Sequence, residues 1–177
     1  MGLMLDSLLV EGFRAFCNKR ELRLDGDLIL VLGRTGAGKT SIVDAIEFAL
    51  SGSTYEARTI GDLRLDDLVN DFSSAARVIL RLKDVEGRVY EVERVKVPGK
   101  PVKARLTVDG VEYRVNGRKP SSREVSEKIK ELIKLGVEEL SRQVIVREGE
   151  MRRLVYGTRA ERSEALDRLL GIEELER

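Results

Sequence analysis

The segment LILVLGRTGAGKTSIVDAIEFAL, residues 28–50, decides the fold of this chain. Its first five residues are apolar and run directly into the pattern G-x-x-x-x-G-K-T, which extends from Gly33 to Thr40. An apolar segment of helical character follows. This order of strand, glycine-rich loop and helix predicts a phosphate-binding loop at the start of a helix that packs against a sheet.

The residue types of this loop suit the phosphates of a nucleotide. Backbone N–H groups at a helix N-terminus neutralise phosphate charge, and glycines allow the close approach that this requires. Lys39 is expected to reach the β and γ phosphates, and the Thr40 hydroxyl to bind Mg²⁺. We therefore predict that ATP and Mg²⁺ bind residues 33–41, through Gly33, Thr35, Gly36, Ala37, Gly38, Lys39, Thr40 and Ser41. The alternative is an ordinary glycine-rich turn, which the flanking strand and helix disfavour.

Size and composition set broad limits. With 177 residues the chain can build one core and a smaller subdomain. Its 32 Lys and Arg nearly cancel 31 Asp and Glu, so net charge argues for no particular partner. Heavy charge usage without His leans towards a thermophile. A single cysteine, Cys17, fits a reducing cytosol, and no apolar run approaches the ~18 residues of a membrane span, so we expect a cytoplasmic protein.

Two strands, 3–10 and 20–24, are predicted ahead of the loop strand at 28–32. This order differs from that of small-molecule kinases, where the loop usually follows the first strand. The helix 40–50 is apolar nearly all round and is expected to be buried against a sheet. Residues 54–76 are expected to form an irregular connection with one short helix.

From residue 77 to 118 the apolar pattern alternates with a period of two, which predicts an antiparallel sheet inserted after the loop helix. One hairpin joins strands 78–83 and 88–95. A second joins 104–108 to 111–115 through Asp109-Gly110, a type I′ turn signal. Residues 77–119 hold twelve Lys or Arg against six Asp or Glu. That surplus fits either a nucleic-acid backbone or a solvated sheet face.

Capping boxes mark two helices near the C-terminal end. Ser121 and Glu124 begin one helix, which Gly136 is expected to stop, and Thr158 and Glu161 begin a polar helix whose leucines could start a coiled coil. Between them, residues 143–150 are predicted to form a short buried strand that opens into a loop.

Hydrolysis requires more than a phosphate-binding loop. An Asp must hold the Mg²⁺ shell and another group must orient the attacking water. The only candidate strand after the loop, 144–146, is followed by Arg147 and Glu148 and lacks that Asp. We infer one lobe of a two-piece ATPase.

Several of these features together resemble a known family. They are Gly12-Phe13-Arg14 after the first strand, the early loop, Val43-Asp44-Ala45-Ile46 in its helix, the β-rich insertion, and the run from Val144 to Glu150. The chain is similar to the N-terminal lobe of an SMC-type ATPase head, most closely to the Rad-fifty/SbcC DNA double-strand-break repair family, also through 76–97 and Leu169-Leu170-Gly171-Ile172.

The resemblance implies an α/β fold, that of a P-loop NTPase: the N-terminal lobe of an ABC-type head, with an antiparallel β-sheet subdomain and the start of a coiled-coil helix. The lobe would span 1–164, with the loop at 33–41, the insertion at 77–118 and the Q-loop region at 144–151, and the coiled coil would begin at 165–177. A C-terminal lobe would bring the ABC signature and the Mg²⁺-binding acid. Two heads would sandwich two ATP molecules, and DNA and a nuclease subunit of the Mre-eleven type would bind, with no membrane and a nucleoid-associated location.

The resemblance also assigns roles to two further residues. Arg14 matches a basic residue near the phosphates, where a surface arginine is the plain alternative. Glu148 stands where the family has the Q-loop glutamine, so Lys39 and Glu148 are the catalytic candidates and Thr40 and Glu148 the Mg²⁺ candidates. A carboxylate can ligate Mg²⁺ but cannot donate a hydrogen bond as an amide does, so an exposed loop acid is the alternative and Gln143 a weaker substitute.

Three functions remain open at this point. The first is the ATP-binding lobe of a DNA-repair ATPase, which alone would bind Mg·ATP weakly and turn it over negligibly. The second is a chromosome-organising head of the SMC or condensin type. The third is a non-ABC P-loop protein, such as a regulator or kinase, which the two strands ahead of the loop disfavour. A Cys-x-x-Cys hook or a globular hinge farther along the full-length protein would separate the first two.

Overall fold

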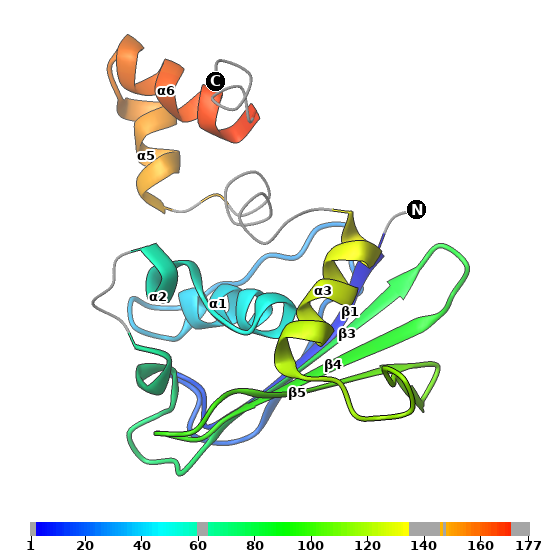
Figure 1. Cartoon of the computed structure of the whole chain (residues 1–177). Helices are drawn as coiled ribbons and strands as arrows, with labels where there is room; N and C mark the ends of the chain where they lie inside the picture. Colours follow the sequence, from blue (N-terminus) through cyan, green and yellow to red (C-terminus); the bar gives the residue numbers. More distant parts are fainter. Residues whose placement is uncertain (1–2, 60–63, 135–145, 147, 171–177) are drawn as a thin grey trace. The chain divides into compact units, whose positions relative to one another are not determined.

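The computed structural model describes residues 3–59, 64–134, 146 and 148–170. The chain divides into two compact units, Met1–Ile133 and Lys134–Arg177. In the first unit, helices α1 and α3 lie over an antiparallel sheet (Figure 1). The second contains two helices. No helix among the described residues is long and apolar enough to cross a membrane.

The sheet of the first unit has six strands in the order β2-β1-β3-β4-β5-β6, and every neighbouring pair is antiparallel. The strands are β1 Leu3–Glu11, β2 Arg20–Arg23, β3 Ala76–Asp84, β4 Val89–Lys96, β5 Lys103–Val108 and β6 Val111–Glu112. The predicted hairpins are present, although β6 ends before residue 115. Because β1 pairs with β3, the inserted strands continue the N-terminal strands instead of forming a sheet of their own.

The second hairpin turns as its sequence predicts. Asp109 and Gly110 have φ angles of 49° and 78°, and two successive positive values are what a type I′ turn requires. The Asp109 carboxylate accepts a hydrogen bond of 2.8 Å from the N–H of Val89. This turn therefore fixes the register of β5 and β6 and also binds the start of β4.

The inner face of the sheet carries the core. Val78, Leu80 and Leu82 of β3 are buried there, in the predicted alternation. Phe48 of α1 (Lys39–Ser51) is fully buried, and its ring lies 5.5 Å from that of Phe13. Val125 and Ile129 of α3 (Ser122–Ile133) complete this layer, so both helices bury apolar surface against one side of the sheet.

The outer face of the sheet carries a ladder of alternating charges. Glu93 of β4 accepts hydrogen bonds from Arg77 of β3 at 2.7 Å and from Arg105 of β5 at 3.0 Å. One step along the strands, Glu91 pairs with Arg81 at 2.8 Å. Cross-strand pairs of opposite sign favour this register. The ladder neutralises much of the basic surplus of 77–119 and supports the interpretation of a solvated sheet face over its central strands.

A buried arginine joins the two helices to the sheet. Arg94 of β4 is fully buried, and its nitrogens donate to the carbonyl oxygens of Ala49 at 2.7 Å and Leu50 at 3.2 Å. They also donate to the hydroxyls of Ser122 at 2.7 Å and Ser126 at 2.8 Å. Burial lowers the pKa of Arg94 to about 10, which still leaves it a cation at neutral pH. A cation is favourable at the carbonyl end of α1.

The predicted loop strand is the main discrepancy. Residues 28–32 form no strand in the described structure, and their side chains are exposed, from 40% at Ile29 to 91% at Leu28. An apolar run of this kind is typical of a strand buried on both faces of a parallel sheet. Such a strand needs neighbours on each side, and no described residue pairs with this one.

The remaining segments are short. The connection after α1 contains α2 (Tyr55–Thr59) and the 3-10 helix η1 (Leu65–Leu68), close to the single short helix that was expected. Ser121 and Glu124 form the predicted capping box, with N–H to oxygen distances of 2.8 and 3.2 Å. Gly136, the predicted end of α3, lies outside the described residues.

In the second unit, α5 spans Glu148–Tyr156 and α6 spans Arg159–Leu170. Thr158 and Glu161 cap α6 as predicted. The loop predicted at residues 148–150 is wrong, because α5 begins at Glu148. Glu, Met, Arg and Leu favour helix through 148–154, and an acid is favourable in a first turn. Residues 143–145 and 171–177 lie outside the described residues, and Val146 is exposed where a buried strand was expected.

Replacing Arg94 by Met keeps most of the side-chain volume but removes the donor of two helix carbonyls. Buried polar groups without partners cost about 1–3 kcal/mol each, so we expect R94M to lower the free energy of unfolding by about 2–4 kcal/mol in urea titrations. R77M is the matched control on the outer face and should lose about 1 kcal/mol or less. Equal losses in the two variants would contradict this role of Arg94.

Candidate nucleotide-binding site

The glycine loop between residues 33 and 38 adopts a conformation that its sequence explains. Gly36 and Gly38 have φ angles of 81° and 89°, which other residues rarely adopt. A Cβ on Gly36 would meet no atom within 4 Å, so this glycine borders open space. A Cβ on Gly38 would lie 3.0 Å from that of Ala15, so Gly38 is also needed for close packing against the loop after β1.

The start of α1 leaves its backbone N–H groups available to an anion. Gly38 is the N-cap residue, no side chain makes a capping hydrogen bond there, and the first turn contains no acidic residue. The first N–H groups of a helix have no partner inside the helix, and the helix dipole adds positive charge at this end. The geometry therefore suits a phosphate group.

Lys39 lies over the loop that it is predicted to serve. Its Nζ donates to the carbonyl oxygens of Gly33 at 2.8 Å and Arg34 at 2.9 Å, and its side chain is exposed. Thr40 is also exposed, as are Thr35 and Ala37, whereas Ser41 is buried. The predicted loop residues are thus gathered in one turn, with the ammonium and the Thr40 hydroxyl at the surface.

Arg14 does not lie free at the surface. Its Nη1 is 2.7 Å from Asp44 Oδ2 of α1 and 3.0 Å from Glu56 Oε2 of α2. Asp44 follows Thr40 by four residues, about one helical turn. The structure therefore places Arg14 one turn from the loop, between two carboxylates that the sequence analysis did not assign to it. A charged residue on the apolar face of the loop helix was the signal for Asp44.

Glu148 is the first residue of α5 and belongs to the second unit. Gln143 lies outside the described residues. The described residues contain no cluster of three or more His, Cys, Asp or Glu that could hold a metal. Mg²⁺ characteristically keeps waters and phosphate oxygens and needs one or two protein ligands, which the exposed Thr40 hydroxyl beside a phosphate site can satisfy.

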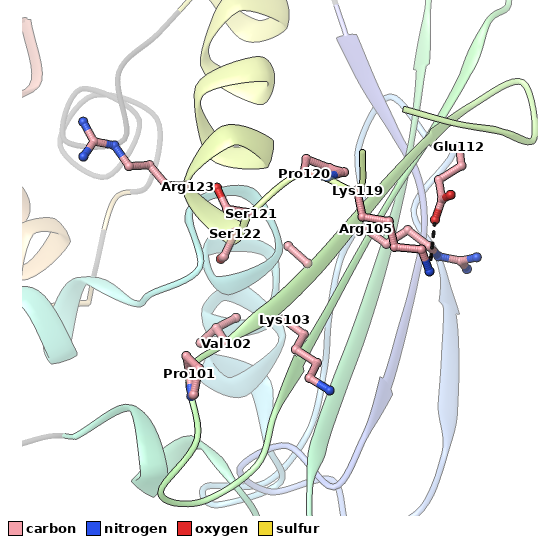
Figure 2. Close-up of a pocket in the computed structure, with 11 residues that line it drawn as sticks. Pro101, Val102, Lys103, Arg105, Glu112, Lys119, Pro120, Ser121, Ser122 and Arg123 are labelled. Atoms are coloured by element: carbon pink, nitrogen blue, oxygen red, sulfur yellow. Dashed lines mark ion pairs between the residues drawn. The ribbon is translucent and has the colours of Figure 1, made fainter. Parts of the chain in front are cut away.

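A basic groove of about 680 Å³ lies where β5 meets the start of α3. Lys103, Arg105 and Lys119 carry its positive charge, and Glu112 pairs with Lys119 at 3.9 Å (Figure 2). Among the described residues Lys103 has no ion pair, in contrast to the arginines of the outer-face ladder. The remaining lining residues are Pro101, Val102, Ala104, Pro120, Ser121, Ser122 and Arg123, and Arg123 projects away from the other cations. Composition alone did not locate this groove.

Comparison with known proteins identifies related chains. A family model described as AAA domain matches residues 7–176. Arcadin-4 of Pyrobaculum calidifontis is 36% identical over 93% of this chain and 19% of its own length. The DNA double-strand break repair Rad50 ATPase of Methanococcus maripaludis is 26% identical over 99% and 16%, and the SbcC component of the nuclease SbcCD from Deinococcus radiodurans 30% over 93% and 18%. The chain thus spans less than a fifth of the length of these relatives.

A solved structure agrees on the fold. The recombination mediator protein RecF, in a structure with ATP, has a TM-score of 0.55 over 97% of this chain and 39% of its own, at 14% identity. At this identity the likeness concerns the fold alone. It confirms the predicted α/β class.

Replacing Lys39 by Ala tests the loop directly. Charge-assisted contacts to phosphate contribute about 1.5–3 kcal/mol, so we expect K39A to weaken ATP binding about 10- to 100-fold in calorimetric titration. Since the described bonds of Lys39 are to its own loop, the melting temperature should stay close to that of the unaltered chain. K103A, in the groove, is the control and should leave ATP affinity unchanged. Unaltered affinity in K39A would count against the loop as the site.

Proposed function

The chain belongs to the AAA domain family, as an N-terminal ATPase lobe of the Rad50, SbcC and SMC type, and from that premise we propose that it binds Mg·ATP at residues 33–41 as one half of a composite ATPase head. Lys39 would bind the β and γ phosphates. The free N–H groups at the start of α1 would bind the phosphate oxygens.

The exposed apolar run at 28–32 is the observation that carries the composite site. Five successive apolar residues in front of a phosphate-binding loop are costly to leave in water, since burial contributes about 25 cal/mol per Å². Strands on both sides would bury them and would hold Gly33 from behind. We propose that a C-terminal ATPase lobe supplies these strands, together with the acid that completes the Mg²⁺ shell.

The chain's own residues would then have distinct tasks. Thr40 would ligate Mg²⁺, which when bound draws the phosphate oxygens together and offsets their charge. Glu148 would act at the edge of the metal shell as an acceptor, because a carboxylate cannot donate to a phosphate. Arg14 would offer a planar guanidinium to the phosphates. Turnover would require the second lobe, and two heads would enclose ATP between them.

The wider role follows from the relatives. Because one relative is named a DNA double-strand break repair ATPase and another a part of a nuclease, we propose that ATP-driven head dimerisation here serves repair with a nuclease partner. For DNA, the basic groove is the favoured contact within this lobe. Its lysines are not matched by carboxylates as the ladder arginines are, and phosphate backbones select such surfaces.

Turnover tests the composite site. We expect the chain alone to bind ATP but to release phosphate at a rate near background, because groups that complete the metal shell are absent from the described site. Adding the C-terminal lobe of the same protein should raise the rate by at least about a hundredfold, the scale of one missing electrostatic contribution. Rapid turnover by the chain alone in a phosphate-release assay would refute the proposal.

Removing Lys103 and Lys119 together tests the groove. Each phosphate contact contributes a slope of about −0.9 in the logarithmic salt dependence of DNA affinity, so the K103A/K119A variant should reduce that slope by up to about two. The matched control is R77A/R81A on the outer face, where both arginines already pair with carboxylates. Filter binding to duplex DNA across a salt series measures both. A larger loss in the control would place DNA on the outer face.

A further inference from the structure

Three charged groups meet beside the nucleotide loop. Arg14 follows β1, Asp44 belongs to α1 and Glu56 belongs to α2, and one guanidinium nitrogen lies within 3.0 Å of both carboxylates. The side chain of Arg14 is 25% exposed, that of Asp44 7% and that of Glu56 34%. The cluster holds one cation against two anions, so the arginine is bound more strongly than a single surface pair would hold it.

The backbone of Arg14 is fixed. Its φ of 45° is unusual for a residue other than glycine. Its N–H donates to the carbonyl oxygen of Leu68 at 2.9 Å, and its carbonyl oxygen accepts from the side chain of Asn70 at 2.6 Å. Any change in the position of the guanidinium must therefore come from side-chain torsions, which are fast and need no rearrangement of the chain.

The cluster lies next to the site where phosphates would bind. Ala15, the residue after Arg14, lies so close to Gly38 that a Cβ there would be 3.0 Å away. Asp44 stands one turn of α1, about 6 Å of helix rise, beyond Thr40. The two carboxylates thus hold a phosphate-seeking side chain within one helical turn of the loop.

We propose that Asp44 and Glu56 form a latch that holds Arg14 away from the nucleotide, and that the triphosphate competes with them for the guanidinium. This inference rests on the proposed function, since it concerns the same site. Phosphate accepts two parallel hydrogen bonds from arginine and carries more charge than one carboxylate. Binding of ATP therefore releases the latch, and the carboxylates set how much affinity this release consumes.

The latch makes an unusual prediction, which is that removing an acidic side chain strengthens binding. Glu56→Gln keeps the size of the side chain and removes its charge. We expect E56Q to bind ATP about two- to fivefold more tightly, the factor associated with one partly exposed ion pair. R14A should weaken binding, and the double variant R14A/E56Q should match R14A, because without the guanidinium there is nothing to release. Adenosine, which has no phosphates, should respond to none of these changes.

A control and a second variant keep the test decisive. E91Q removes a carboxylate from an arginine pair on the outer face, Glu91 with Arg81, and should leave ATP affinity unchanged. If E56Q proves too unstable in thermal melts, E56D, which withdraws the carboxylate by one methylene, should give an intermediate gain. Calorimetric titration with Mg·ATP measures every variant.

The possible results separate the latch from the site. Unchanged or weaker binding in E56Q, with K39A still deficient, would overturn the latch and leave the nucleotide site intact. A gain in E56Q that persists in R14A/E56Q would also overturn it, because the effect would then be a general loss of negative charge. Normal binding in K39A would instead overturn the proposed function itself.

Discussion

The structure depends on one buried cation. Arg94 projects from β4 into the core and donates to the last carbonyls of α1 and to two serines of α3, with carbonyl and hydroxyl oxygens as its partners in the described bonds. Gly52, the C-cap residue of α1, has no side chain partly for this reason, since a Cβ there would lie 2.8 Å from the guanidinium. The C-terminal end of the loop helix is therefore fixed to the sheet, and its opposite end is free to carry the loop.

This arrangement sets the direction in which the helix acts. A cation at the carbonyl end and an uncapped N-terminus at the other end align with the helix dipole, so both ends favour an anion at the loop. The same packing brings Asp44 to the loop after β1, where it meets Arg14. The core of the lobe and the polarity of the site are thus consequences of the same helix placement.

The sequence predicts those features whose causes are local. Capping boxes, the Asp109-Gly110 turn and the alternation of β3 depend on neighbours in the chain, and the structure has them where they are expected. The run at 28–32 has the composition of a strand, but a strand is made by its partners, which this sequence does not reveal. Sequence reasoning missed Arg94 although its phase gave a signal, because it alternates in step with buried Tyr90 and Val92.

The basic surplus of residues 77–119 shows why counting charges is not enough. Two of its twelve cations, Arg94 and Lys96, are buried on the inner face, and the central arginines of the outer face are matched by Glu91 and Glu93. What distinguishes the groove is that its lysines have few acids beside them. The ladder neutralises charge across the middle of the sheet, so the field that an anion would meet is concentrated at the β5 end. A polyanion would therefore meet this lobe at one edge of its sheet, while the central strands remain a neutral, solvated surface.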